Sequence, residues 1–228
     1  MDKAIAKADV LIEALPYIQE FRGATIVVKF GGSAMEERRN FESILTDVTF
    51  MECVGMLPVI VHGGGKAISR AMTEAGLAPK FVKGLRVTDE ATIRVVEDVI
   101  THKVNTGICA ALEAPGARAR RIDGDTVFQV ETRAAIDEAT GETLDWGYVG
   151  EIKHVDIEPV RAFVSAGLFP VITPLRMSSS TSRMCRVESS EVSSLRSRSR
   201  PGTSDRKASL RALRARAMAA AASSALRL

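Results

Sequence analysis

The sequence predicts an α/β fold in which a mainly parallel sheet is flanked by helices. Two observations support this prediction. Short runs of β-branched and other apolar residues alternate with stretches in which apolar residues recur every three or four positions. Two of the runs are followed by glycine clusters, at residues 31–32 and 63–65, and each cluster precedes a helical stretch. Repeated strand, glycine turn and helix are typical of parallel strands joined by crossover helices.

The first element is a predicted amphipathic helix. Apolar side chains recur at helical spacing on one face, at Ile5, Ala8, Leu11, Ile12, Leu15 and Ile18. We interpret residues 1–22 as a separate N-terminal helix, and we expect Pro16 to kink it because proline cannot donate the backbone hydrogen bond.

Residues 23–175 are predicted to form one α/β lobe. Its first two strands are the β-rich runs 25–30 and 57–62, each ending at a glycine cluster. Helical spacing over 36–55 and 66–75 places a helix after each strand. These four elements form the core of the predicted parallel sheet.

The second half of the lobe is predicted from caps, turns and one further apolar run. Thr88 is expected to cap a long helix that starts near residue 89, where two acidic residues suit the helix dipole, and ends near residue 112. The remaining predicted elements are a hairpin over 120–130, a second hairpin over 139–152, a short helix over 159–166 and a third buried strand over 168–173.

Charge and composition change abruptly after residue 175. The chain has 228 residues and a formal net charge of +3, to which residues 1–175 contribute −6 and residues 176–228 contribute +9. The second segment holds 14 Ser, 11 Arg and 9 Ala, and no Phe, Tyr, Trp or Ile. Such a composition buries too little apolar surface to offset the entropy lost on ordering. We therefore expect a disordered or locally helical tail that is not a folded domain.

Cysteine usage and hydropathy favour a cytoplasmic protein without a membrane partner. The three cysteines form no C-x-x-C pair, which argues against a disulfide framework or a zinc site. No apolar run approaches the roughly 20 residues that a membrane-spanning helix needs. The N-terminus also lacks the long apolar stretch of a signal peptide.

The two glycine clusters are candidate anion-binding turns. Parallel strands end at one edge of a sheet, where ligands bind, and glycine lets backbone N–H groups approach an anion. Lys29 lies just before the first cluster, either as a solvated strand end or as an ammonium that neutralises a transferred phosphoryl group. A P-loop needs Ser or Thr at position 67, where this chain has Ala67. A dinucleotide-binding fingerprint needs Gly or Ala at position 68, where this chain has Ile68. Both motifs are therefore disfavoured.

Three further positions have two interpretations each. Arg86 is either a surface arginine on a hairpin or a guanidinium fork for a substrate carboxylate. His62 is expected to orient the glycine triplet rather than bind a metal ion. Asp123 and Asp125 flank Gly124, and we interpret this segment as a turn rather than a metal site.

Three segments together resemble the N-terminal signatures of the N-acetyl-L-glutamate kinase family. They are IVVKFGGSAM at 26–35, VIVHGGG at 59–65 and KGLRVT at 83–88, followed in order by GYVGE at 147–151 and FPVITPL at 169–175. The similarity runs from about residue 8 to residue 175. It implies the amino acid kinase fold, a three-layer sandwich, of which residues 23–175 would be the N-terminal, acyl-substrate-binding lobe.

The resemblance also implies a reaction and its residues. The γ-phosphoryl group of ATP would be transferred to the side-chain carboxylate of N-acetyl-L-glutamate in arginine biosynthesis, with Mg²⁺ as cofactor. Lys29 would be the catalytic residue. The phosphoryl group would contact Lys29, Gly31, Gly32 and Gly64, and the substrate would contact Gly64, Gly65 and Arg86.

Residues 1–22 resemble the extra helix of the arginine-inhibited, hexameric family members. In those members the helix interlaces dimers and contributes to the inhibitor site. The resemblance thus implies a homo-oligomer, a dimer or a hexamer, with arginine as feedback inhibitor. Without the resemblance, the sequence favours a helix packed on its own domain.

The resemblance stops at residue 175. The family continues with an Asn-x-Asn-Ala-Asp segment and a nucleotide-binding lobe with a second catalytic lysine, which residues 176–228 do not match. Our hypothesis is that the tail is an out-of-frame translation of a GC-rich gene, and we expect little or no kinase activity. The alternative is a non-enzymatic protein whose basic tail binds nucleic acid or an acidic surface, although the tail lacks aromatic residues for base stacking.

Overall fold

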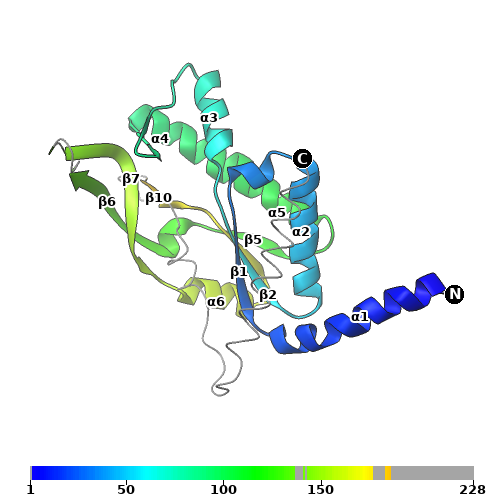
Figure 1. Ribbon diagram of the computed structural model, residues 1–228. Helices are drawn as coiled ribbons and strands as arrows, with labels where there is room; N and C mark the ends of the chain where they lie inside the picture. Colours follow the sequence, from blue (N-terminus) through cyan, green and yellow to red (C-terminus); the bar gives the residue numbers. More distant parts are fainter. Residues whose placement is uncertain (1, 137–140, 142, 177–182, 186–228) are drawn as a thin grey trace. The chain divides into compact units, whose positions relative to one another are not determined.

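A four-stranded parallel sheet forms the centre of the computed structural model, which describes residues 2–136, 141, 143–176 and 183–185 (Figure 1). Its strands, in spatial order, are β1 (Thr25–Phe30), β2 (Leu57–His62), β8 (Phe169–Ile172) and β5 (Ala119–Ile122). All three neighbouring pairs are parallel. The three apolar runs predicted as strands are therefore confirmed, and they are adjacent in this sheet.

Helices α2 (Arg38–Cys53) and α5 (Thr106–Glu113) cover one face of the central sheet. The side chains in this layer alternate along each strand, as expected for a pleated sheet with both faces buried. They form one cluster with the helices, made of Phe30, Ile60, Phe169 and Val171 from the sheet and Leu45, Val48, Ile108 and Leu112 from the helices.

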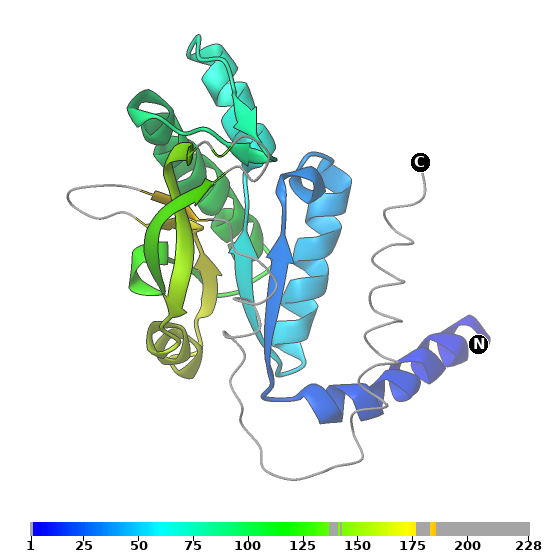
Figure 2. The same cartoon turned by 60° about the vertical axis from the view of Figure 1, so that its left-hand side comes forward.

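The opposite face is covered by helix α6 (Glu158–Ser165) and by a second sheet. That sheet contains β6 (Phe128–Ile136), β7 (Thr143–Val155), β10 (Arg183–Cys185) and β9 (Leu175–Arg176). Figure 1 and Figure 2 both show it on the side of the central sheet away from α2. Val59 and Ile172 of the central sheet pack here against Phe128 and Val160. Helices, central sheet and second sheet confirm the predicted three-layer α/β architecture.

The predicted hairpin over 120–130 is wrong. β5 belongs to the central sheet and β6 to the second sheet, with the 3₁₀ turn η3 (Gly124–Thr126) between them. A Cβ at Gly124 would overlap the carbonyl oxygens of Thr173 and Leu175, so the chain passes tightly under the end of β8. Turn residues predict a reversal of the chain but not the sheet that the next strand joins. The second predicted hairpin is confirmed, because β6 and β7 pair antiparallel.

The predicted long helix begins at a different cap and is not uniformly α-helical. Asp89 is the N-cap residue, and its carboxylate accepts a 2.8 Å hydrogen bond from the Thr92 amide. The helical stretch comprises α4 (Glu90–Glu97), a π-helical segment η2 (Asp98–Asn105) and then α5. Thr88 is instead fully buried, and its backbone bridges to Gly147.

The predictions for the two ends of the chain have different outcomes. Helix α1 (Asp2–Phe21) is confirmed and continues past Pro16. The expectation of a tail without strands is wrong at 183–185, where β10 pairs with β7 and β9. Residues 177–182 and 186–228 lie outside the described residues, and with them the alternative of a tail that binds nucleic acid. None of the helices in the described part of the chain is long and apolar enough to cross a bilayer.

Candidate active site

The two predicted glycine turns lie at the same edge of the central sheet. Lys29 is in register with Val61 and Phe30 with His62, so β1 and β2 end side by side. The Gly63 amide donates a 2.9 Å hydrogen bond to the Phe30 carbonyl and ties the second turn to the end of the first strand. Helix α3 (Gly65–Glu74) begins immediately afterwards and directs its N-terminus at this edge.

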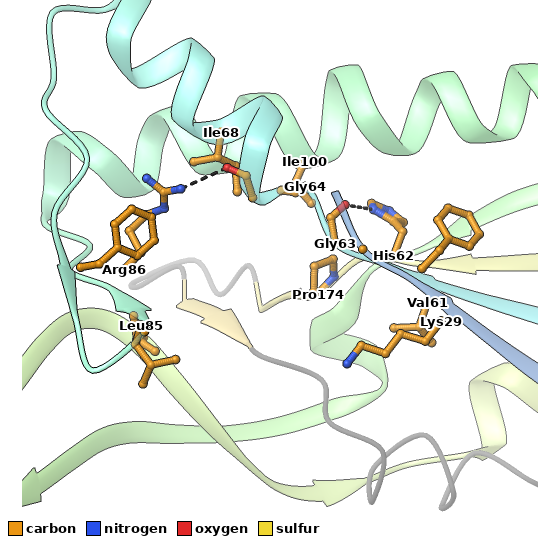
Figure 3. A pocket seen from close by; sticks show the side chains of 16 residues that line it. Lys29, Val61, His62, Gly63, Gly64, Ile68, Leu85, Arg86, Ile100 and Pro174 are labelled. Atoms are coloured by element: carbon orange, nitrogen blue, oxygen red, sulfur yellow. Dashed lines mark hydrogen bonds between the residues drawn. The ribbon is translucent and has the colours of Figure 1, made fainter. Parts of the chain in front are cut away.

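These turns open onto a cavity of about 430 Å³. Five of the six predicted site residues line it, namely Lys29, Gly31, Gly64, Gly65 and Arg86. The sixth, Gly32, starts the 3₁₀ turn η1 (Gly32–Met35) and lies outside the lining. Figure 3 shows Arg86 and Lys29 at opposite ends of the lining, with the glycine turn and Pro174 between them.

A two-residue hairpin turn brings Arg86 to the cavity. Strands β3 (Phe81–Val82) and β4 (Leu85–Arg86) pair antiparallel, and the turn residues Lys83 and Gly84 have φ values of 48° and 78°. Two successive positive φ values characterise the type I′ turn, whose twist matches that of paired strands. The hairpin ends at Arg86, directly above the N-terminal turn of α3.

Arg86 is buried without a carboxylate partner. Only 5% of its surface is exposed, and the described residues include no carboxylate in ion-pair distance of it. Its guanidinium donates to Ser69 Oγ at 2.7 Å, the Gly65 carbonyl at 3.1 Å and Met72 Sδ at 3.0 Å. Burial lowers the pKa of the guanidinium, but an arginine stays charged at neutral pH. A buried, uncompensated cation beside a cavity is the arrangement expected of an anion-binding site.

The charge of the cavity is one-sided. Lys29 and Arg86 are the two charged residues in the described lining, which contains no aspartate or glutamate. The Lys29 side chain is exposed to the cavity rather than buried in the sheet, and Figure 3 shows its ammonium directed into the open space. A ligand with two separated negative charges therefore fits this lining better than a neutral one.

His62 contacts the glycine triplet, as the sequence predicts. It is 2% exposed, and its Nδ1 lies 3.0 Å from the Gly63 carbonyl oxygen. Burial lowers the pKa of its imidazole to about 4, so the ring is neutral at pH 7. No group of three or more metal-ligating side chains occurs among the described residues.

We predict that His62 makes the free energy of unfolding depend on pH. Its pKa is about 4 in the folded chain and 6.5 without burial, so the unfolded state binds the proton more tightly. The contribution of His62 to the free energy of unfolding is fully present above pH 6.5. Up to about 3 kcal/mol of it is lost as the pH falls toward 4. Urea unfolding at pH 7, 6, 5 and 4 should show a smaller loss for His62→Gln than for the unmodified chain. Equal losses in both would contradict the prediction.

Several residues of the site were missed by sequence reasoning. Ser69 and Met72 hold the Arg86 guanidinium, and the Phe81 ring lies 4.7 Å from it. Ile100 of η2 lines the cavity beside Gly64. Ser69 and Met72 carried no signal of their own, because a serine at the edge of a helix and a methionine on its apolar face are both ordinary there. Phe81 and Ile100 carried none, since an apolar residue near a turn or in a helix is ordinarily part of the core.

The chain is similar to known proteins over most of its length. The acetylglutamate kinase of Carboxydothermus hydrogenoformans is 43% identical over 179 residues, which cover 77% of this chain and 61% of the relative. The acetylglutamate kinase of Symbiobacterium thermophilum is 40% identical over 175 residues, which cover 76% of this chain and 60% of the relative. The chain thus spans about 60% of the length of these curated relatives.

A solved structure and a family model extend the comparison. N-acetylglutamate synthase from Neisseria gonorrhoeae, solved with coenzyme A and N-acetyl-glutamate, is 25% identical with a TM-score of 0.64, over 77% of this chain and 39% of that one. The model of the amino acid kinase family matches residues 24–217. On sequence and on fold, the chain belongs to the amino acid kinase family.

Proposed function

We propose that the cavity binds N-acetyl-L-glutamate as the phosphoryl acceptor of an acetylglutamate kinase. The observation that carries this proposal is the buried Arg86, which has no carboxylate partner among the described residues and lies across the cavity from Lys29. N-acetyl-L-glutamate has two carboxylates separated by a short apolar chain. Two separated cations suit such a ligand.

The lining supports a different role for each end of this substrate. The guanidinium of Arg86 would pair with the α-carboxylate and donate to it from the N–H groups that Gly65, Ser69 and Met72 do not use. The apolar side chains of Ile68, Leu85 and Val149 line the same cavity and would contact the methylene and acetyl groups. The side-chain carboxylate would then point toward Lys29 and the glycine turns.

Lys29 would act during phosphoryl transfer. ATP supplies the phosphoryl group and Mg²⁺ offsets phosphate charge when both are bound. Both reactants are anions, so an ammonium at the acceptor end lowers their repulsion as charge develops on the transferred group. Gly31 and Gly64 would let this group approach the backbone closely. The described lining thus fits the phosphoryl end of ATP, and Mg²⁺ would be held mainly by phosphate oxygens, as is usual for this ion.

We further propose that helix α1 packs on a second copy of the chain. Its large apolar side chains are between 41% and 66% exposed, at Ile5, Val10, Leu11, Ile12, Leu15 and Tyr17. A single copy rarely leaves so many apolar side chains of one helix in water. Together with this interface, we propose that arginine is a feedback inhibitor. Light scattering with and without arginine tests the association of copies and its response to arginine.

Calorimetric titration of the full chain tests the proposed substrate. N-acetyl-L-glutamate is expected to bind, whereas N-acetyl-L-glutamine, which lacks the side-chain charge, and L-glutamate, which lacks the acetyl group, are expected to bind at least about tenfold more weakly. Equal affinity for the acid and the amide would refute the role of Lys29. A coupled ADP-release assay is expected to show little or no turnover, and an ordinary enzymatic rate would contradict the sequence interpretation of residues 176–228.

A further inference from the structure

We propose that the π-helical segment η2 is a positioning element for the second glycine turn, and that Asn105 is a positioning residue that acts through His62. The inference rests on the proposed function for its effect on substrate binding. Its structural part, a link from η2 through His62 to Gly63 and Gly64, stands on contacts alone.

The His62 and Asn105 side chains have a single consistent hydrogen-bond arrangement. The Asn105 amide nitrogen lies 3.0 Å from His62 Nε2 and 3.2 Å from the Val171 carbonyl oxygen, so its two N–H groups have two acceptors. A flipped amide would place its oxygen against the Val171 carbonyl. His62 Nε2 must then accept, and the neutral ring carries its proton on Nδ1, where it donates to the Gly63 carbonyl. The pair joins β8, β2 and the turn.

The π-helix explains why Ile100 reaches the turn while Asn105 reaches His62, which contacts the same turn. A Cβ at Gly64 would overlap Ile100 Cδ1, so this side chain lies directly on the turn. The two residues are five positions apart, which is the hydrogen-bond step of a π-helix. In an α-helix, at about 100° per residue, positions five apart diverge by about 140°. The π-helical segment thus aligns two side chains that an α-helix would separate.

Both contacts act on the backbone that forms the proposed substrate site. Asn105 orients His62, which holds the Gly63 carbonyl, while Ile100 packs on Gly64. The next carbonyl, that of Gly65, accepts a hydrogen bond from Arg86. A shift of this turn would therefore move the glycine N–H groups and the Arg86 guanidinium together. Asn105 does not line the cavity, so its influence on a ligand is indirect.

The first test is the tautomer of His62, measured by imidazole ¹⁵N NMR on the full chain. We expect His62 to be neutral and protonated on Nδ1 at pH 7, whereas the exposed His102 and His154 are expected to show the Nε2–H tautomer and serve as internal controls. Substitutions of His102 and His154 by Gln assign the signals. A His62 ring protonated on Nε2 would overturn the link, whatever the chain binds.

The second test compares variants on η2 and the adjoining α5. Asn105→Asp removes both N–H donors and places a carboxylate beside His62, so we expect His62 to become protonated at pH 7 and N-acetyl-L-glutamate to bind about tenfold more weakly. Thr106→Val, which removes the hydrogen bond from Thr106 Oγ1 to the Thr101 carbonyl, is the control and is expected to leave both readouts unchanged.

Ile100→Val keeps the test decisive if Asn105→Asp does not fold. The variant removes only the methyl group that touches Gly64, and Ile108→Val makes the same change in α5 away from the cavity. We expect altered Gly63 and Gly64 amide shifts and weaker binding for Ile100→Val alone. Unchanged shifts and affinity in Ile100→Val would overturn the positioning role. If the unmodified chain binds no N-acetyl-L-glutamate, the proposed function fails, and the amide shifts still decide this inference.

Discussion

Replacing Arg86 by alanine is expected to weaken binding of N-acetyl-L-glutamate by at least about a hundredfold. Arg86 is 5% exposed, and the described partners of its guanidinium are two oxygens, a sulfur and the Phe81 ring, all uncharged. A carboxylate ligand would supply the missing negative charge beside a largely buried guanidinium, where charge-assisted hydrogen bonds are strong. Calorimetric titration of the variant against N-acetyl-L-glutamate measures the loss.

Two further variants separate this role from general effects of charge and packing. Arg86→Lys keeps the charge but loses the planar fork. Its affinity for N-acetyl-L-glutamate is expected to lie between those of the unmodified chain and Arg86→Ala. Arg94→Ala removes an exposed arginine that pairs with Glu90 on the surface of α4, and it is expected to bind normally. Normal affinity in a folded Arg86→Ala variant would remove the main support for the proposed function.

Replacing Gly147 by alanine is expected to lower the free energy of unfolding by about 3 kcal/mol or more. Gly147 has a φ of +67°, and a Cβ there would overlap the backbone carbonyl of Thr88. Because the Thr88 carbonyl belongs to the backbone, it cannot rotate away as a flexible side chain would. Thr88 is also hydrogen-bonded on both sides of Gly147, from its amide to the Trp146 carbonyl at 2.9 Å and from the Tyr148 amide to its carbonyl at 2.7 Å. Urea unfolding at pH 7 measures the effect.

Gly76→Ala is the matched control for backbone strain. Gly76 has a φ of +73°, close to that of Gly147, but a Cβ there would meet nothing within 4 Å. Alanine at Gly76 should therefore cost only the left-handed conformation, about 1 kcal/mol. Similar losses at the two positions would show that the approach of Thr88 to Gly147 is not the cause.

The Gly147 substitution is also expected to reduce binding of N-acetyl-L-glutamate. Thr88 follows Arg86 by two residues, and the neighbouring Trp146 indole donates a 3.0 Å hydrogen bond to the Val82 carbonyl of the same hairpin. Strand β7 thus contacts the hairpin that carries Arg86 at two points, through the Trp146 indole at Val82 and through the backbone at Thr88. A Gly147→Ala variant that stays folded with full affinity would show that the hairpin keeps its place without this bridge.

The candidate site was more predictable at the glycine turns than at the arginine. Glycine clusters after two β-branched runs indicate turns at one sheet edge, because parallel strands must end together, and β1 and β2 do so in register. For Arg86 the residue pattern favoured a surface arginine, and only the family resemblance implied a fork for a substrate carboxylate. Its burial depends on Ser69 and Met72 from α3 and on Phe81 of its own hairpin, and no local pattern encodes those contacts.

The sequence by itself determined three strands of the central sheet, their parallel arrangement with helices and the glycine turns, because these depend on local propensity and on the spacing of apolar residues. Only the tertiary structure decided that β5 and β6 enter different sheets, that η2 is π-helical and that β10 pairs with β7. Each of these depends on partners far away in the chain. The same holds for the site: Lys29, Arg86 and the glycines were visible in the sequence, but the cavity that joins Lys29 to Arg86 exists only once β1, α3 and the hairpin β3–β4 are packed together.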